Sequence, residues 1–241
     1  MTTVWIIAKK ELNSFFDSLL AYIMIIAFLV FTGLFTWLLG RTIFLMNEAS
    51  LQSFFGVAYW ALFLFIPALT MKLIAEERSN GTLELILTKP VSDSQIIFGK
   101  FLAVLLLVII SLALTLPYYI TVASIGPIDH GATIMGYIGL ILMSAAYISI
   151  GIFASSITNN QIISFLLALF IGIFFHLLFG IISGYFHGII GNTLDYLSIS
   201  THYESIIRGV VDSKDLIYFL TIIFLGLFGA ELSISKRNLT D

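Results

Sequence analysis

The sequence predicts an all-α, polytopic membrane protein with six transmembrane helices. Three observations predict it: 59% of the 241 residues are hydrophobic, only 10% are charged, and the charges divide the chain into long apolar runs. A typical soluble domain carries about 25% charged residues, and small soluble folds leave much of their chain in contact with water. Composition therefore excludes a soluble enzyme, a nucleic-acid-binding protein and a disordered chain.

The charge-free runs locate the spans. Residues 18–40 and 49–71 carry no charged side chain, and each run reaches about 34 Å as a helix, enough for a hydrocarbon core of about 30 Å. Residues 130–194 contain no Asp, Glu, Lys or Arg, which requires two spans with a turn in the polar segment 155–161. The expected helices are 19–40, 54–75, 99–123, 134–155, 161–183 and 215–234.

An even number of spans places both termini on one side of the membrane. The predicted loops on that side carry Lys9, Lys10, Lys72, Arg78, Lys89, Lys100, Lys236 and Arg237, whereas the other side carries only Arg41, Arg208 and Lys214. The positive-inside rule therefore predicts that both termini are cytoplasmic. The chain contains no cysteine, which excludes disulfides and thiolate metal sites.

The N-terminal segment, residues 1–18, has the spacing of an amphipathic helix. One face carries the apolar residues Trp5, Ala8, Leu12, Phe15, Phe16 and Leu19. The opposite face carries the polar residues Lys9, Lys10, Asn13 and Asp17. Such a helix is expected to lie in the membrane interface. The alternative is a topogenic anchor that leads into the first span.

Residues 76–98 form the most strongly charged loop on the terminal side. Asn80-Gly81 marks a turn, residues 82–87 fit a helix of about two turns, and Pro90 ends that helix near residue 89. Ser92 and Gln95 form a capping box that starts the helix leading into the third span. The expected structure is a helix-turn-helix elbow, and the alternative is a solvated loop that carries topogenic charge.

Residues 184–214 lie between the fifth and sixth expected spans. This segment is too apolar for a free loop and is interrupted by Gly184, Gly188 and Gly191. A re-entrant or interfacial helical hairpin is expected, because non-helical backbone at that depth must be buried in protein or line water.

Motifs for reactive chemistry are absent from the sequence. Gly99-Lys100 is followed by Phe101, so no GxxxxGK[ST] loop exists, and the chain is not expected to bind ATP in the P-loop manner. Neither HExxH nor GxSxG occurs, which removes the basis for zinc-protease and serine-hydrolase activity. The chain is therefore predicted to be non-catalytic and to bind no metal.

His176 is the sole ionisable residue deep inside an expected span. Such a residue is a candidate functional site, but a neutral histidine that makes one hydrogen bond across a helix interface explains it equally well. Gly180, Gly184 and Gly188 recur at intervals of four residues. This small-residue stripe predicts a close helix-packing face in preference to a binding site.

Residues 76–92 (Glu-Glu-Arg-Ser-Asn-Gly-Thr-Leu-Glu-Leu-Ile-Leu-Thr-Lys-Pro-Val-Ser) resemble the cytoplasmic loop of ABC-2 type transporter permeases. In that family the loop is a coupling helix that docks into a groove of the ATPase subunit. The six-span topology resembles the family, a type V ABC exporter-like fold, over the whole chain as a single domain, residues 1–241. The resemblance implies that the elbow contacts an ATPase through Glu76, Glu77, Arg78, Gly81, Thr82, Leu83, Glu84, Leu85 and Pro90.

Residues 200–219 look like the outer segment of two narrower groups of permeases. These are the gliding-motility-associated permeases, which the short chain resembles most, and the nitrous-oxide-reductase maturation permeases. The residues that carry this resemblance to an extracytoplasmic segment include Tyr203, Arg208, Gly209 and Asp212.

The resemblance implies a permease subunit that couples ATP hydrolysis to export or to force transmission in a bacterial inner membrane. The implied partners are a cytoplasmic ABC ATPase that binds ATP and Mg²⁺, a second identical or homologous permease, and a periplasmic or membrane partner. This chain itself is expected to bind no cofactor and no nucleic acid. The alternatives are an ATP-independent secondary transporter or channel, for which only His176 qualifies, and an intramembrane enzyme, for which no catalytic set exists.

Overall fold

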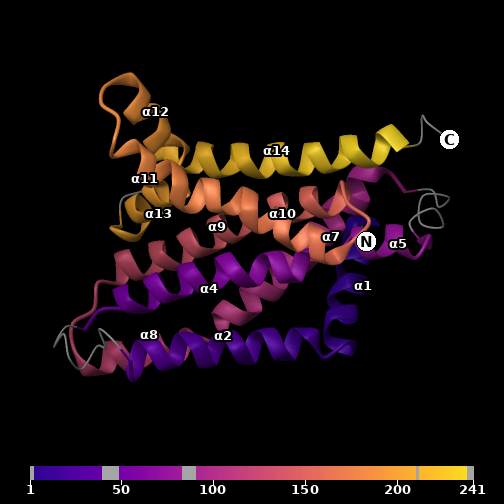
Figure 1. Ribbon diagram of the computed structural model, residues 1–241. Coiled ribbons are helices and arrows are strands. Elements are labelled where there is room, and N and C mark those ends of the chain that lie inside the picture. Colours follow the sequence, from indigo (N-terminus) through magenta and orange to yellow (C-terminus); the bar gives the residue numbers. More distant parts are fainter. Residues whose placement is uncertain (1–2, 40–48, 83–90, 210–211, 238–241) are drawn as a thin grey trace.

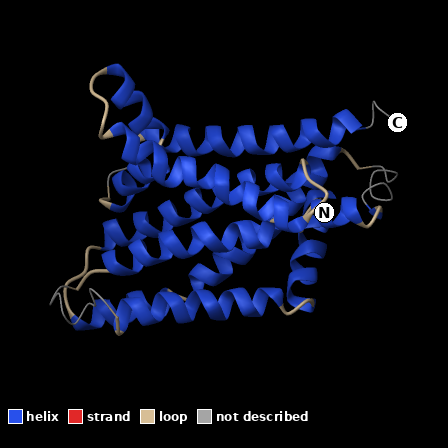
Figure 2. Ribbon diagram, in the orientation of Figure 1, coloured by secondary structure: helices blue, strands red, loops and turns tan. Residues whose placement is uncertain are grey.

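The structure is a computed structural model that describes residues 3–39, 49–82, 91–209 and 212–237 (Figure 1). All regular secondary structure within these ranges is helical, which confirms the all-α prediction (Figure 2). The helices are α1 (Thr3–Asp17), α2 (Leu20–Trp37), α4 (Gln52–Thr70), α5 (Ala75–Ser79), α7 (Asp93–Ala113), α8 (Leu116–Ile125), α9 (His130–Ser156), α10 (Gln161–Ile173), η1 (Phe174–Leu178), α11 (Phe179–Ser183), α12 (Ile189–Leu197), α13 (Ile199–Ile207) and α14 (Ser213–Arg237).

Six helical segments of the described chain are long and apolar enough to cross a membrane, which confirms the predicted number. They are Leu20–Trp37, Gln52–Ser79, Asp93–Ile125, His130–Ser156, Gln161–Ser183 and Ser213–Ser235. The second and third segments extend further than predicted. The second includes α5 beyond a short turn, and the third starts six residues earlier than predicted, at the capped end of α7.

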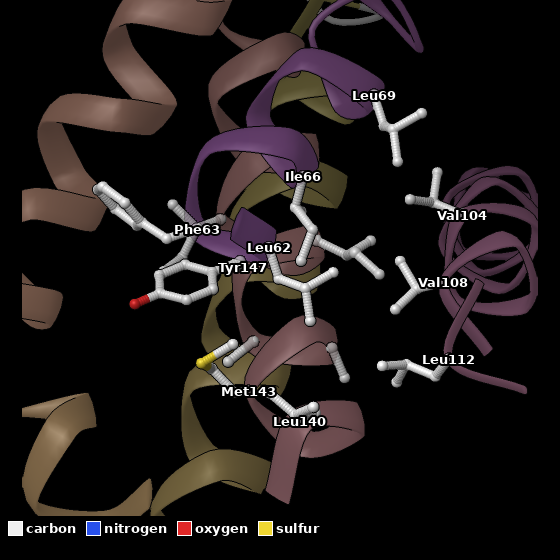
Figure 3. Close-up of a cluster of buried hydrophobic side chains, with 14 of the residues drawn as sticks. Leu62, Phe63, Ile66, Leu69, Val104, Val108, Leu112, Leu140, Met143 and Tyr147 are labelled. Carbon is white, nitrogen blue, oxygen red and sulfur yellow. The ribbon is translucent and has the colours of Figure 1, made fainter. Parts of the chain in front are cut away.

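The fourth segment, α9, forms the centre of the bundle, with α4, α7, α10, α13 and α14 packed around it. It is the most buried of the six. Of the residues in its apolar stretch 78% are buried, against 17% in the α10–α11 segment. Small residues allow this, because Gly151 faces Thr70 of α4 and Ser149 faces Gly226 of α14. Between α4 and α7 the core is aliphatic, and Figure 3 shows Leu62, Ile66 and Leu69 facing Val104, Val108 and Leu112.

Figure 1 places the N- and C-terminal ends at the same end of the bundle, here called the terminal end, together with α5. Helices α12 and α13 lie at the opposite end, here called the far end. The outer segment is thus built from two short helices joined at Ser198. Their position relative to a membrane surface stays a prediction.

Helix α1 runs across the terminal end at a steep angle to α2 (Figure 1). The apolar face predicted for this helix divides between the bundle and the outside, and its place in a membrane interface stays a prediction. Ala8 and Phe15 are buried, but Trp5 and Leu19 are exposed. The reason is that α1 packs on the start of α7, where Gly99 has no side chain and leaves room for Ile7.

Candidate functional site

The elbow begins where α4 ends and the chain turns through residues 71–74 into α5. The hydroxyl of Ser155, at the end of α9, accepts hydrogen bonds from the backbone N–H groups of Ile74 (3.1 Å) and Ala75 (3.0 Å). The same hydroxyl donates to the carbonyl of Met71 (3.1 Å). One side chain of the central helix therefore satisfies three backbone groups of the turn and fixes the direction of α5.

Helix α5 carries three of the predicted elbow residues, Glu76, Glu77 and Arg78, and it ends at Ser79. Gly81 has a φ of 68°, in the left-handed region that favours glycine, which confirms the predicted turn. Thr82 closes this turn by donating its hydroxyl to the carbonyl of Glu77 (3.2 Å). The other predicted elbow residues, Leu83, Glu84, Leu85 and Pro90, lie outside the described residues, as do residues 83–87 of the predicted helix 82–87.

The chain re-enters the bundle through the predicted capping box. The Ser92 hydroxyl accepts from the Gln95 N–H and the Gln95 side-chain oxygen accepts from the Ser92 N–H, both at 3.3 Å. The neighbouring Ser94 hydroxyl donates to the carboxylate of Glu231 in α14. The start of α7 is therefore locally capped and tied to the last helix.

Lys100, in the second turn of α7, is the buried charge of the elbow, with 1% of its surface exposed. Its ammonium donates to carboxylate oxygens of Glu77 (2.7 Å) and Glu11 (3.3 Å). That Glu77 pairs with an ATPase stays a prediction, and within the chain one of its carboxylate oxygens binds Lys100. The physical reason is that a buried ammonium is costly unless a carboxylate compensates it.

Sequence reasoning counted Lys100 only as a topogenic charge and did not single out Glu11. A signal was present, since Lys100 lies inside the apolar run Ile96–Leu107, interrupted otherwise only by Gly99. A charge in that position needs a partner, although its identity depends on how α1 and α5 fold back.

A polar cavity of about 340 Å³, here called the elbow groove, opens between α1 and the α4–α5 junction. Its α1 wall includes Lys10, Ser14 and Ser18, and its elbow wall includes Glu76 and Asn80. The ammonium of Lys72 crosses between the walls, 5.0 Å above the centre of the Phe15 ring. The groove therefore presents positively and negatively charged side chains, together with several hydroxyl or amide groups, at the terminal end.

A second cavity of about 510 Å³ lies toward the far end, between α4, η1, α11 and α13, and is here called the far-end cavity. It brings together four residues that the sequence predicted for different reasons, His176, Gly180, Tyr203 and Arg208. Sequence reasoning did not assign the other lining residues to a site, and among these are Gln52, Tyr59, Trp60 and Glu204.

His176 lies on the five-residue π-helical turn η1, buried among aromatic rings. Its ring stacks on Tyr59 and Phe63, with centroid distances of 4.1 and 4.2 Å. Its Nδ1 atom lies 2.6 Å from the hydroxyl of Tyr147 in α9. This is the geometry of the predicted alternative, a single hydrogen bond across a helix interface, although His176 also lines the far-end cavity.

The predicted packing face of three glycines is not formed as one stripe. At Gly180 an added side chain would lie 3.1 Å from the hydroxyl of Ser198, so α11 approaches α13 closely there. Helix α11 ends at Ser183, however, and Gly184 and Gly188 therefore lie beyond it. Gly188 instead starts α12 with a φ of 70°, a conformation that glycine permits.

The four predicted outer residues have different roles in the structure. Tyr203 donates its hydroxyl to the carbonyl of Phe55 (3.2 Å), and burial raises its pKa well above the ordinary value, so it stays a neutral donor. Arg208 pairs with Glu204 (3.4 Å) on the exposed rim of the far-end cavity. Gly209, with a φ of 84°, ends α13.

Asp212 caps the start of α14 by accepting a hydrogen bond from the N–H of Lys214 (3.1 Å). This hydrogen bond and the ammonium of Lys214, at 3.1 Å, lower the pKa of the Asp212 carboxyl. Asp212 and Gly209 therefore shape the connection between α13 and α14.

His202 forms a buried pair that sequence reasoning missed. Its Nδ1 lies 2.6 Å from a carboxylate oxygen of Asp215 in α14, and its Nε2 lies 2.8 Å from the carbonyl of Tyr196 in α12. One imidazole thereby joins α12, α13 and α14. In the sequence the acidic residue nearest to His202 is Glu204. Asp215 is 13 residues away and meets His202 only because α14 packs against α13.

Within the described residues, no group of three His, Asp or Glu side chains is arranged to hold a metal ion. No curated protein matches the chain. The family model of the ABC-2 family transporter proteins matches residues 41–234, which include the elbow, the outer helices α12 and α13 and the central helix α9. The chain belongs to the ABC-2 transporter family.

Proposed function

We propose that this chain is the permease subunit of an ABC transporter and that its elbow receives force from a separate ATPase subunit. The observation that carries the proposal is the fixed direction of α5, which Ser155 sets through three hydrogen bonds at the turn after α4. Family membership supports it, as does the absence of a P-loop in the sequence.

A path for the force follows from the helix order. Helix α5 joins α4 through residues 71–74, and the opposite part of α4 carries Tyr59 and Trp60, which line the far-end cavity. A push on α5 therefore displaces a wall of that cavity, because packed helices move as rigid elements. ATP and Mg²⁺ act in the ATPase, and this chain supplies the lever and the cavity.

The assembly we propose is a bacterial inner-membrane complex with both termini in the cytoplasm. Six spans make half of a twelve-span transporter, so a second permease, identical or homologous, completes it. Residues 200–219 support a gliding-motility or cell-surface role, through export or through force on a periplasmic or membrane partner. A role in nitrous-oxide-reductase maturation is the alternative for the same segment.

The test is to co-express the chain with candidate ABC ATPases. ATP hydrolysis by the purified complex is then compared with hydrolysis by the ATPase alone. Gly81→Val is expected to keep the complex but abolish the effect of the permease on hydrolysis, because Val disfavours a φ of 68°. Gly184→Ala is the matched control, since Gly184 has an ordinary φ of −66° and space for a methyl group. The proposal fails if no ATPase co-purifies, or if Gly81→Val leaves the effect of the permease on hydrolysis unchanged.

A second candidate function, ATP-independent proton-coupled transport, is favoured by one observation. His176 is a buried titratable side chain that lines the far-end cavity. Uptake into vesicles driven by a proton gradient, with no ATPase present, and lost on His176→Gln would support this function. This function is dismissed if uptake does not depend on the proton gradient in either the unchanged protein or the His176→Gln variant.

A further inference from the structure

We infer that Lys100 is a positioning residue that clamps α1 to the elbow, so that α1, α5 and the start of α7 move as one unit. The clamp is a property of this chain alone, whereas its role in coupling rests on the proposed function. The sequence by itself predicts that α1 is an anchor in the membrane interface, separate from the elbow. In that prediction the membrane positions α1, whereas in this inference the ion pairs of Lys100 position it.

The first argument is the charge arrangement. Lys100 is buried and belongs to α7, Glu77 belongs to α5 and Glu11 belongs to α1. One ammonium therefore bridges carboxylates from two other helices. Removing the centre of such a network takes the buried ammonium away from both carboxylates and leaves Glu11 with the exposed Lys10 at 3.9 Å, which is more costly than losing a surface pair.

The second argument is the packing next to this charge. An added side chain at Gly99 would lie 2.5 Å from a methyl carbon of Ile7 and 3.2 Å from the carbonyl oxygen of Val4. The backbone of α7 therefore lies directly against α1 one residue before Lys100. This contact is what brings Glu11 within 3.3 Å of the ammonium.

The third argument is the connection from α1 to α2. Leu19, between the two helices, has a φ of 58°, a left-handed conformation that non-glycine residues rarely adopt. The helical backbone is therefore broken there, and α2 does not continue into α1. The direction of α1 is therefore set by side-chain contacts, chiefly with α7, by the ring of Phe16 packing on Tyr22 of α2, and by the ion pair of Glu11 with Lys100.

The consequence concerns the elbow groove. Glu11 lines the groove from the α1 side and Glu77 lines it from the elbow side, and Lys100 binds both. The clamp thus holds the two walls at a fixed separation. In the proposed complex the ATPase would meet a composite surface of α1 and the elbow, and a force on either wall would reach α7.

The test measures the separation of the walls in the full-length permease alone. Because the chain has no cysteine, Ser14→Cys and Asn80→Cys supply two unique spin-label sites, both exposed and on opposite walls. Pulsed electron paramagnetic resonance in lipid nanodiscs is expected to give one narrow distance distribution. Glu11→Gln is expected to broaden it, because the tie to α1 is weakened.

Glu11→Gln is the decisive variant because it leaves the 2.7 Å pair between Lys100 and Glu77 intact, so the elbow keeps a compensated charge. Glu11→Asp, which keeps the charge, is expected to restore much of the narrow distribution. Lys9→Met is the control, since Lys9 is exposed on the same helix and lies outside the groove. Lys100→Met extends the series and is expected to broaden the distribution further if the protein folds.

A second measurement addresses coupling. In the complex with its ATPase, Glu11→Gln is expected to reduce the effect of the permease on ATP hydrolysis several-fold while the complex still co-purifies. If the distance distribution of Glu11→Gln matches that of the unchanged protein, the clamp is wrong, whatever the ATPase does. If the distribution broadens but no ATPase binds the unchanged chain, the clamp stands and the proposed function fails.

Discussion

The hydroxyl of Ser155 accepts a hydrogen bond from the backbone N–H of Ala75 at 3.0 Å, although 80 residues separate them in the chain. The bond joins the end of the central helix α9 to the first residue of α5. In the proposed transporter the elbow acts as a lever that must be stiff where it leaves the bundle, and this bond lies at that place. Its removal is therefore the most direct probe of the elbow.

Ser155→Ala is expected to lower stability by about 1–3 kcal/mol, because two buried N–H groups lose their acceptor. Thermal unfolding in detergent measures this. The matched control is Ser156→Ala, since the Ser156 hydroxyl bonds only to the carbonyl of Phe153 in its own helix among the contacts described. Equal melting temperatures for the two variants would contradict the role given to Ser155.

Gly151 sets how closely α4 approaches α9. A methyl group there would overlap the hydroxyl of Thr70, so Gly151→Ala is expected to cost about 1–3 kcal/mol by overpacking. Gly56→Ala is the control, because no atom lies within 4 Å of the new methyl group and alanine favours a helix. If thermal unfolding ranks the two variants the other way, the close approach is wrong.

The pair of His176 and Tyr147 is open to a double-mutant cycle. Tyr147→Phe or His176→Phe alone removes the 2.6 Å hydrogen bond. The hydroxyl that stays buried in His176→Phe loses its partner, at a cost of about 1–3 kcal/mol. The double variant is expected to recover part of that cost, because Tyr147→Phe removes the hydroxyl that His176→Phe leaves without a partner. Strict additivity of the melting shifts would show that the hydrogen bond is absent.

Asp215 is expected to hold the outer helices through His202. Asp215→Asn replaces a buried carboxylate 2.6 Å from the imidazole and should increase hydrogen exchange in residues 196–207. Asp212→Ala removes an exposed carboxylate that pairs with Lys214 at 3.1 Å and caps α14. Its effect is expected in the first turn of α14, with little change of exchange in residues 196–207, since exposed pairs contribute about 0–1 kcal/mol. Unchanged protection in Asp215→Asn would rule out the buried pair as the support of this segment.

Local features of the elbow were predictable because their causes are local. Asn80-Gly81 marks the turn through the backbone freedom of glycine, and Ser92 with Gln95 marks the helix start through side chains that reach the adjacent backbone. The same reasoning failed for Gly188, because four-residue spacing predicts a stripe only if the helix continues, and α11 ends at Ser183.

The sequence by itself determined that this protein is helical, that six segments can cross a membrane and that a charged elbow joins the second and third. Hydropathy, charge spacing and turn residues suffice for these conclusions. Only the tertiary structure decided that Lys100 lies between Glu11 and Glu77, that Ser155 fixes α5, and that His202 meets Asp215. The physical reason is that lipid and protein interior are equally apolar, so composition does not mark which helix face meets which neighbour.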